Sequence, residues 1–220
     1  MDLRKPARVM VRMIGVMGGT FDPVHFGHLR TAVEVKESLN LDELRLVPCR
    51  EPPHRPMPLA PAELRLSMLE RAIGDEPGLL VDTREIERSG PSYTYATLRS
   101  LREEFPDQSL GLILGMDAFS GLQSWLRWQE LPDLAHFIVL HRPGVRPEIP
   151  KALSRLDRCR FLDRAEDFNG TETGCVYFQR VSQLEISSTA IREIIRSNKN
   201  ARFLLPDPVL ELIREQQLYR

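Results

Sequence analysis

The sequence predicts an α/β fold, with an open parallel β-sheet carrying helices on both faces. Apolar runs typical of buried strands alternate with segments whose apolar residues recur at helical spacing. That alternation is typical of a parallel sheet crossed over by helices. The expected strands cover residues 9–17, 44–48, 79–82, 109–114, 135–140 and 175–180. The expected helices cover 29–39, 61–73, 93–105 and 208–217, and one more begins at 186.

The chain has 220 residues, which suits one domain of this class. We expect residues 1–8 to form a disordered lead and residues 9–220 to form a single domain. Residues 144–174 show no clear periodicity, so they are expected to be a mobile excursion or an extra helix.

Bulk composition excludes several classes of partner. The chain carries 30 basic and 31 acidic residues, a formal net charge of −1, which favours neither a nucleic acid polymer nor a membrane as partner. No apolar stretch approaches the length of a membrane span, and no signal peptide is recognised. Three cysteines without metal-ligand spacing fit a reducing compartment, so the expected location is the cytoplasm. The oligomeric state stays open.

The segment 18–28 joins the first strand to the first helix and predicts a phosphate site. Glycines let the backbone approach a ligand closely, and a helix N-terminus offers unpaired N–H donors. Asp22 is the expected N-cap, with Pro23 at the first helical position. His25 and His28 lie three residues apart, so they share one face. Capping or surface histidines, or half of a metal site, are the alternatives. The expected phosphate contacts besides the histidines are Gly18, Gly19, Thr20 and Phe21.

The segment 186–192 begins a helix near the C-terminus and reads Ile-Ser-Ser-Thr-Ala-Ile-Arg. Its hydroxyls and amides, from Ser187, Ser188 and Thr189, are expected to point at an anion. Arg192 lies one turn further, and its planar fork suits a phosphate. A plain N-cap is the alternative, but it would leave Arg192 unexplained.

Further candidates follow the carboxyl ends of expected strands, where open α/β sheets bind ligands. His54 and Arg55 lie in a proline-rich loop that is equally compatible with an ordinary exposed loop. Asp117 can accept from ribose hydroxyls or cap a helix. Arg142, which follows the end of the strand 135–140, is expected to be a further nucleotide contact. Of the two tryptophans, Trp125 is expected to stack on a planar ring and Trp128 to join the core.

Both signatures, Gly-Gly-Thr-Phe-Asp-Pro-x-His-x-Gly-His and Ile-Ser-Ser-Thr-x-Ile-Arg, resemble those of the nucleotidyltransferase superfamily, whose members transfer AMP or CMP from a nucleoside triphosphate. The resemblance implies a Rossmann-like sheet of the nucleotidyltransferase type, with both histidines on triphosphate oxygens. It assigns catalysis to His25, His28 and Arg192. Magnesium (Mg²⁺) would then arrive with ATP, without a protein metal site.

A narrower resemblance covers nearly the whole chain from about residue 10. It is a resemblance to the bacterial nicotinate mononucleotide adenylyltransferases. Besides the His-x-Gly-His element, the matching segments are 52–55, 91–94, 115–117, 204–210 and 218–220. The implied reaction joins ATP and nicotinate mononucleotide into deamido-NAD and pyrophosphate. The implied mononucleotide-binding residues are His54, Arg55, Thr94, Asp117, Trp125 and Leu126, with backbone amides near Thr94 and Leu126 reading the pyridine carboxylate.

Three alternatives stay open. Pantetheine-phosphate adenylyltransferases share the first motif but have Thr at the His25 position. An adenylyltransferase that prefers nicotinamide mononucleotide is closer, because side chains say little about acid or amide preference. A non-catalytic nucleotide-binding regulator is the third, and intact His25, His28 and Arg192 argue against it.

Overall fold

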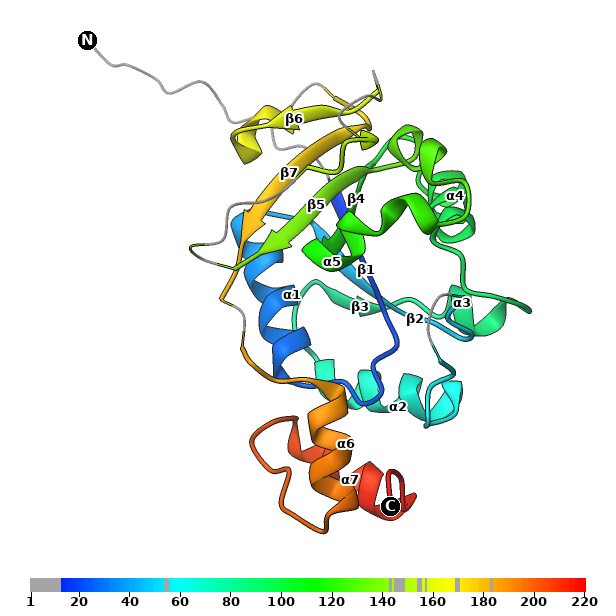
Figure 1. The fold of residues 1–220 in the computed structure, drawn as a ribbon, viewed down its shortest axis with the longest axis vertical. Coiled ribbons are helices and arrows are strands. Elements are labelled where there is room, and N and C mark those ends of the chain that lie inside the picture. Colours follow the sequence, from blue (N-terminus) through cyan, green and yellow to red (C-terminus); the bar gives the residue numbers. More distant parts are fainter. Residues whose placement is uncertain are drawn as a thin grey trace.

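A computed structural model describes residues 13–53, 56–142, 144, 149–153, 156, 158–168, 171–182 and 184–220. The expected lead at 1–8 and the residues His54 and Arg55 lie outside this range. Seven strands form one sheet in the order β3-β2-β1-β4-β5-β7-β6, and every pair is parallel. The α/β class is therefore confirmed (Figure 1). The strands are β1 (Met13–Gly19), β2 (Glu43–Pro48), β3 (Leu79–Val81), β4 (Ser109–Gly115), β5 (His136–His141), β6 (Arg160–Leu162) and β7 (Cys175–Arg180).

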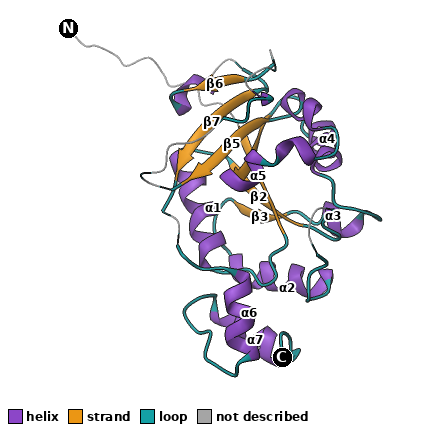
Figure 2. Ribbon diagram, viewed as in Figure 1, coloured by secondary structure: helices purple, strands orange, loops and turns teal. Residues whose placement is uncertain are grey.

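Helices alternate with these strands along the chain, as Figure 2 shows by colour. They are α1 (Phe26–Ser38), α2 (Ala62–Ile73), α3 (Arg84–Glu87), α4 (Thr94–Glu104), α5 (Met116–Ser120), α6 (Ser188–Arg196) and α7 (Asp207–Glu215). Short 3₁₀ turns lie at Leu122–Ser124, Trp128–Asp133 and Ala165–Phe168. No helix in the described part of the chain combines the length and apolar character that a membrane span requires.

The sheet is buried on both faces because alternate side chains of its strands point to opposite sides. In β5, Ile138 and Leu140 join a core with α1, α2, α6 and α7. Their neighbours Phe137 and Val139 join a second core with α4 and α5. The apolar runs of the sequence therefore place a helical layer on each face.

The strand order reverses between β1 and β4, which are neighbours in the sheet although β2 and β3 separate them in the chain. Connections leave these two strands in opposite directions, so a crevice opens at their carboxyl ends. The segment that follows β1 is the predicted phosphate loop, and the segment that follows β4 carries Asp117. The topology thus brings two predicted site segments to one place.

The expectation for residues 144–174 is wrong in one respect. Their described part contains strand β6, which pairs with β7 through Arg160, Phe161 and Leu162 and forms one edge of the sheet. A three-residue strand is too short to produce a readable alternation of polar and apolar residues. Its position depends on pairing with β7, which lies more than ten residues further along the chain.

Candidate active site

The loop after β1 is shaped by Asp22, but not in the predicted way. Helix α1 begins at Phe26 with His25 as its N-cap, so the prediction of Asp22 as N-cap is wrong. The Asp22 carboxylate instead accepts hydrogen bonds from the backbone N–H groups of Leu59 and Ala60, at 2.8 and 3.1 Å. Asp22 thereby ties the phosphate loop to the segment that leads into α2, and α1 starts three residues later than the capping pattern suggests.

His25 and His28 stack on each other at the start of α1, with ring centroids 3.7 Å apart and ring planes inclined by 26°. The predicted shared face is confirmed. The Phe21 ring packs edge-on against His28 at 5.1 Å and is itself 1% exposed. The Phe21 side chain therefore holds an imidazole in place, and the predicted phosphate contact of Phe21 stays a prediction.

Glycine is required in this loop for space. A Cβ at Gly19 would lie 2.9 Å from the Phe21 ring, and a Cβ at Gly27 would lie 2.9 Å from Nδ1 of His25. Neither Gly18 nor Gly19 has positive φ; Phe21 is the residue in the left-handed region, at φ 48°. The glycines thus allow the aromatic and imidazole rings to lie against the backbone, a close approach rather than an unusual dihedral angle.

Both imidazoles are neutral at pH 7 in this structure. Burial lowers the pKa of His25 to about 4, and burial together with the neighbouring imidazole lowers the pKa of His28 to about 3. The Nδ1 atom of each ring is buried without a hydrogen-bond partner among the described residues. The positive lining of the site before a ligand enters therefore comes from Arg192 and helix N-termini, and a triphosphate would favour imidazole protonation.

These lowered pKa values predict weaker folding in mild acid. The unfolded chain binds protons at its histidines from pH 6.5 downwards, whereas folded His25 does not until about pH 4. Stability is therefore fully present above pH 6.5 and falls as the pH drops through this window. Between pH 7.5 and 5, His25 should account for a loss of about 2 kcal/mol. Urea unfolding at both pH values tests this: His25→Gln should shrink the pH-dependent loss by that amount, and an unchanged loss would contradict it.

Helix α6 brings Arg192 to the same loop. Nη1 of Arg192 donates to the backbone oxygen of Asp22 at 2.6 Å, and Nη2 donates to Oγ1 of Thr189 at 3.2 Å. The Oγ of Ser188 donates to the backbone oxygen of Pro23 at 2.9 Å. The two signature segments, far apart in sequence, therefore lie side by side, and the imidazoles and the guanidinium belong to one site.

The hydroxyls of the second signature are already engaged within the protein. Oγ of Ser187 caps α6 by accepting from the Ala190 N–H at 3.2 Å, while Ser188 and Thr189 bond to Pro23 and Arg192. That these hydroxyls also contact an anion stays a prediction. The backbone N–H groups at the start of α6 remain the candidate donors to a phosphate.

A cavity of about 300 Å³ opens at the reversal point of the sheet, between the ends of β1 and β4. Gly18, Gly19 and Thr20 line it from the phosphate loop, and Gly115 lines it from β4. A neighbouring cavity of about 290 Å³ shares part of this lining. Its size suits a small ligand. The residues common to both cavities are Pro52, Pro53, Ser92, Thr94, Ala118 and Trp125.

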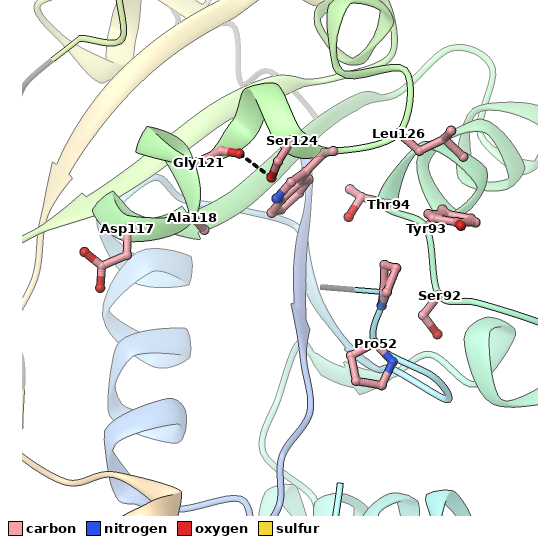
Figure 3. A pocket seen from close by; sticks show the side chains of 11 residues that line it. Pro52, Ser92, Tyr93, Thr94, Asp117, Ala118, Gly121, Ser124 and Leu126 are labelled. Atoms are coloured by element: carbon pink, nitrogen blue, oxygen red, sulfur yellow. Dashed lines mark hydrogen bonds between the residues drawn. The ribbon is translucent and has the colours of Figure 1, made fainter. Parts of the chain in front are cut away.

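The second cavity gathers the other predicted side chains. Asp117, Trp125 and Leu126 line it together with Thr94. Figure 3 shows Thr94, Tyr93 and Ser92 on one side and Asp117 and Ala118 of α5 on the other. Trp128 packs against the core on the α4 side, as predicted.

The start of α4 borders the second cavity and has no side-chain cap. Tyr93 is its N-cap and makes no side-chain capping bond, and the neighbouring Ser92 does not cap the helix either. Oγ of Ser92 accepts instead from the backbone N–H groups of Arg50 and Glu51, at 2.9 and 3.4 Å. Thr94, the first residue of α4, lines the second cavity, so the positive end of the helix dipole lies at the cavity wall.

One predicted contact lies at the periphery. Arg142 follows β5, its side chain is 59% exposed, and Nη1 is 3.6 Å from a carboxylate oxygen of Glu185. It does not line either cavity. His54 and Arg55 lie outside the described residues, although the flanking Pro52 and Pro53 line both cavities.

Sequence reasoning missed a buried guanidinium that joins the two loops of the site. Arg65 of α2 is 1% exposed and donates to the backbone oxygens of Ala60, Thr20 and Arg50, at 3.1, 2.7 and 3.2 Å. Thr20 belongs to the phosphate loop and Arg50 to the proline-rich loop. The sequence does contain one indication of this role, because Arg65 lies on the apolar face of its helix. A buried arginine is almost always paired with protein groups.

Comparison with known proteins agrees with this geometry. The Cytidylyltransferase-like family model matches residues 16–194. The chain is 49% identical over 208 residues to a probable nicotinate-nucleotide adenylyltransferase of Methylococcus capsulatus, covering 94% of this chain and 99% of the relative. It is 45% identical over 212 residues to a probable nicotinate-nucleotide adenylyltransferase of Halorhodospira halophila, covering 96% and 97%.

A solved structure, the Plasmodium falciparum nicotinic acid mononucleotide adenylyltransferase complexed with NaAD, has the same fold. Its TM-score is 0.70 at 18% identity, over 94% of this chain and 97% of that one. The full-length match to the curated relatives and the family model together establish that the chain belongs to the Cytidylyltransferase-like family and, within it, to the nicotinate-nucleotide adenylyltransferases.

Proposed function

We propose that the chain transfers the adenylyl group of ATP to nicotinate mononucleotide, forming deamido-NAD and pyrophosphate. The main support for this proposal is that two features lie next to each other where the strand order of the sheet reverses. A loop with two stacked imidazoles, beside Arg192, adjoins a cavity whose wall includes the start of α4. One part suits a triphosphate, and the other suits a planar ring that carries a carboxylate. The names of the curated relatives support the same reaction.

The reaction needs no protein nucleophile. A phosphate monoester has its second pKa near 6 and is mostly dianionic at pH 7, so the mononucleotide phosphate attacks the α-phosphorus of ATP directly. A P–O bond forms there as the bond to the pyrophosphate oxygen breaks. The protein must align two anions and neutralise the charge on the leaving group. His25, His28 and Arg192 supply those donors, each contributing roughly 3 kcal/mol to lowering the barrier.

The side chains of the phosphate loop bear on how magnesium would be held. The carboxylate in the phosphate loop, Asp22, is bonded to protein donors, and no group of three or more metal-ligating side chains occurs within the described residues. We propose that Mg²⁺ enters on the triphosphate and adds positive charge there, held by phosphate oxygens and water. The chain's own part is to bind the phosphates through imidazole, guanidinium and backbone N–H groups.

We assign nicotinate mononucleotide as the acceptor of the adenylyl group because its pyridine ring carries a negative carboxylate. The first turn of α4 favours an anion by its N–H groups and dipole, so the pyridine carboxylate should bind there better than a neutral amide. Asp117 lines the same cavity from the opposite side, and we propose that its carboxylate accepts from ribose hydroxyls. Trp125 lines both cavities and offers an indole to the pyridine ring.

Pyrophosphate release from ATP, measured with each of the two pyridine mononucleotides, tests the assignment. Nicotinate mononucleotide should react with a kcat/KM more than about tenfold above that of the amide, a difference of about 1.4 kcal/mol. A His28→Ala preparation controls for contaminating enzymes. Equal rates would remove the acid assignment. No pyrophosphate release with either mononucleotide would instead favour a non-catalytic nucleotide-binding regulator.

A further inference from the structure

The Asp22 carboxylate is shared between the phosphate loop and the end of the chain. It is 4% exposed and accepts three hydrogen bonds. Two come from the backbone N–H groups of Leu59 and Ala60, and the third comes from the phenol of Tyr219 to Oδ1 at 2.6 Å. Tyr219 lies in the segment 218–220, outside the two signatures at 18–28 and 186–192. A contact between residues 197 positions apart ties the C-terminal segment to the catalytic loop.

The Tyr219 hydroxyl stays protonated and donates its hydrogen bond to Asp22. Its side chain lies in the core formed by α1, α2, α6 and α7, and the residue is 7% exposed. Burial and the bond to Asp22 raise the pKa of the phenol far above its ordinary value, so the hydroxyl keeps its proton. Figure 1 shows the C-terminus beside α6 and α7, and α7 packs against α2. The core thus fixes the phenol beside the phosphate loop.

Arg192 lies next to the same carboxylate without forming a hydrogen bond to it. Nη1 of Arg192 bonds to the backbone oxygen of Asp22 at 2.6 Å but is 3.8 Å from Oδ2. The phenol and two N–H groups already satisfy the carboxylate, so its pull on the guanidinium is weakened. If the phenol were absent, the less satisfied carboxylate would draw Arg192 inward and engage N–H groups that a phosphate would otherwise use.

We propose that Tyr219 is a positioning residue for adenylyl transfer: its hydroxyl bonds to the Asp22 carboxylate and thereby keeps the remaining N–H groups of Arg192 available to the triphosphate. The proposal rests on the proposed function, because it assigns Tyr219 a task in the ATP half of that reaction. It predicts an effect on ATP and on kcat, and none on the mononucleotide, whose cavity has a different lining.

Tyr219→Phe removes only the hydroxyl and is the direct test. We expect kcat to fall about tenfold and the KM for ATP to rise, because the guanidinium is displaced. The KM for the mononucleotide should stay within about twofold, since no group in its cavity changes. Tyr177→Phe is the matched control: Tyr177 lies on β7 against Phe168, and its variant should match the parent in both substrates.

A double substitution separates positioning from stability. If Tyr219 acts through Arg192, then Tyr219→Phe in an Arg192→Gln background should lower kcat no further. A merely structural hydroxyl would produce the same fold loss in both backgrounds and would raise the KM of both substrates together; either result would overturn the proposal.

If a variant is too unstable for kinetics, the affinity for a non-hydrolysable ATP analogue can be measured at low temperature instead. The effect of Tyr219→Phe is again compared with and without Arg192→Gln. Analogue affinity should fall in Tyr219→Phe and should show no additional fall when Arg192→Gln is already present. An equal fall in both backgrounds would contradict the proposal. The parent enzyme with ATP and nicotinate mononucleotide is the reference: its inactivity would refute the proposed function, while analogue binding would still report on the link between Tyr219 and Arg192.

Discussion

Replacing His28 by alanine is expected to lower kcat by roughly 100-fold or more, because the ring is a donor to charge that develops on the triphosphate. The structure fixes this imidazole from two sides, with the His25 ring stacked on it and the Phe21 ring at its edge. A donor held this way needs little reorganisation as the leaving group gains charge. The loss should appear in kcat and kcat/KM alike, since it concerns the transition state.

Steady-state kinetics with pyrophosphate detection measures the His28→Ala effect. His141→Ala is the matched control, because His141 lies at the partly exposed end of β5 and lines neither cavity. His141→Ala should keep the parent kcat. A folded His28→Ala enzyme with full kcat would remove the imidazole from the mechanism.

Replacing Arg192 by glutamine should also lower kcat by about 100-fold, the loss typical of one transition-state donor. Nη1 holds the backbone oxygen of Asp22, which orients the planar fork beside the phosphate loop. Glutamine removes both the charge and the fork. Arg192→Lys restores the charge without the fork, so it should recover part of the lost activity and remain below the parent.

Arg196→Gln is the control for Arg192→Gln on the same helix. Arg196 lies in the last turn of α6, is half-exposed, and pairs with Glu193 at 2.9 Å. Its loss should change kcat little, because exposed pairs of this kind contribute at most about 1 kcal/mol to stability. Equal losses for the two variants would mean that α6 matters through its fold alone. A fully active Arg192→Lys would mean that charge without fork geometry is sufficient.

The central part of the fold could be predicted because its signals are local. The runs that became β1, β4 and β5 are apolar because both sheet faces are covered, and each is long enough to recognise. The short elements β6, α3 and α5 carry no comparable pattern. Three to five residues give little periodicity, so their structure depends on the neighbours that the rest of the fold supplies.

In the site, too, the features that could be predicted are those with a local sequence signal. The histidines, Arg192 and the residues around Thr94 lie in continuous motifs, so sequence could identify them. The hydrogen bonds that hold them could not be read in the same way. Asp22 has the composition of an N-cap, yet its carboxylate binds Leu59, Ala60 and a phenol near the chain end. Such partners become visible only when distant segments are brought together.

The most direct measurement is a crystal structure of the enzyme with a non-hydrolysable ATP analogue and Mg²⁺. The account predicts triphosphate oxygens within about 3 Å of nitrogen atoms of His25, His28 and Arg192, with the α-phosphate facing the cavity lined by Thr94 and Trp125. A triphosphate bound away from both imidazoles and from the guanidinium would contradict it.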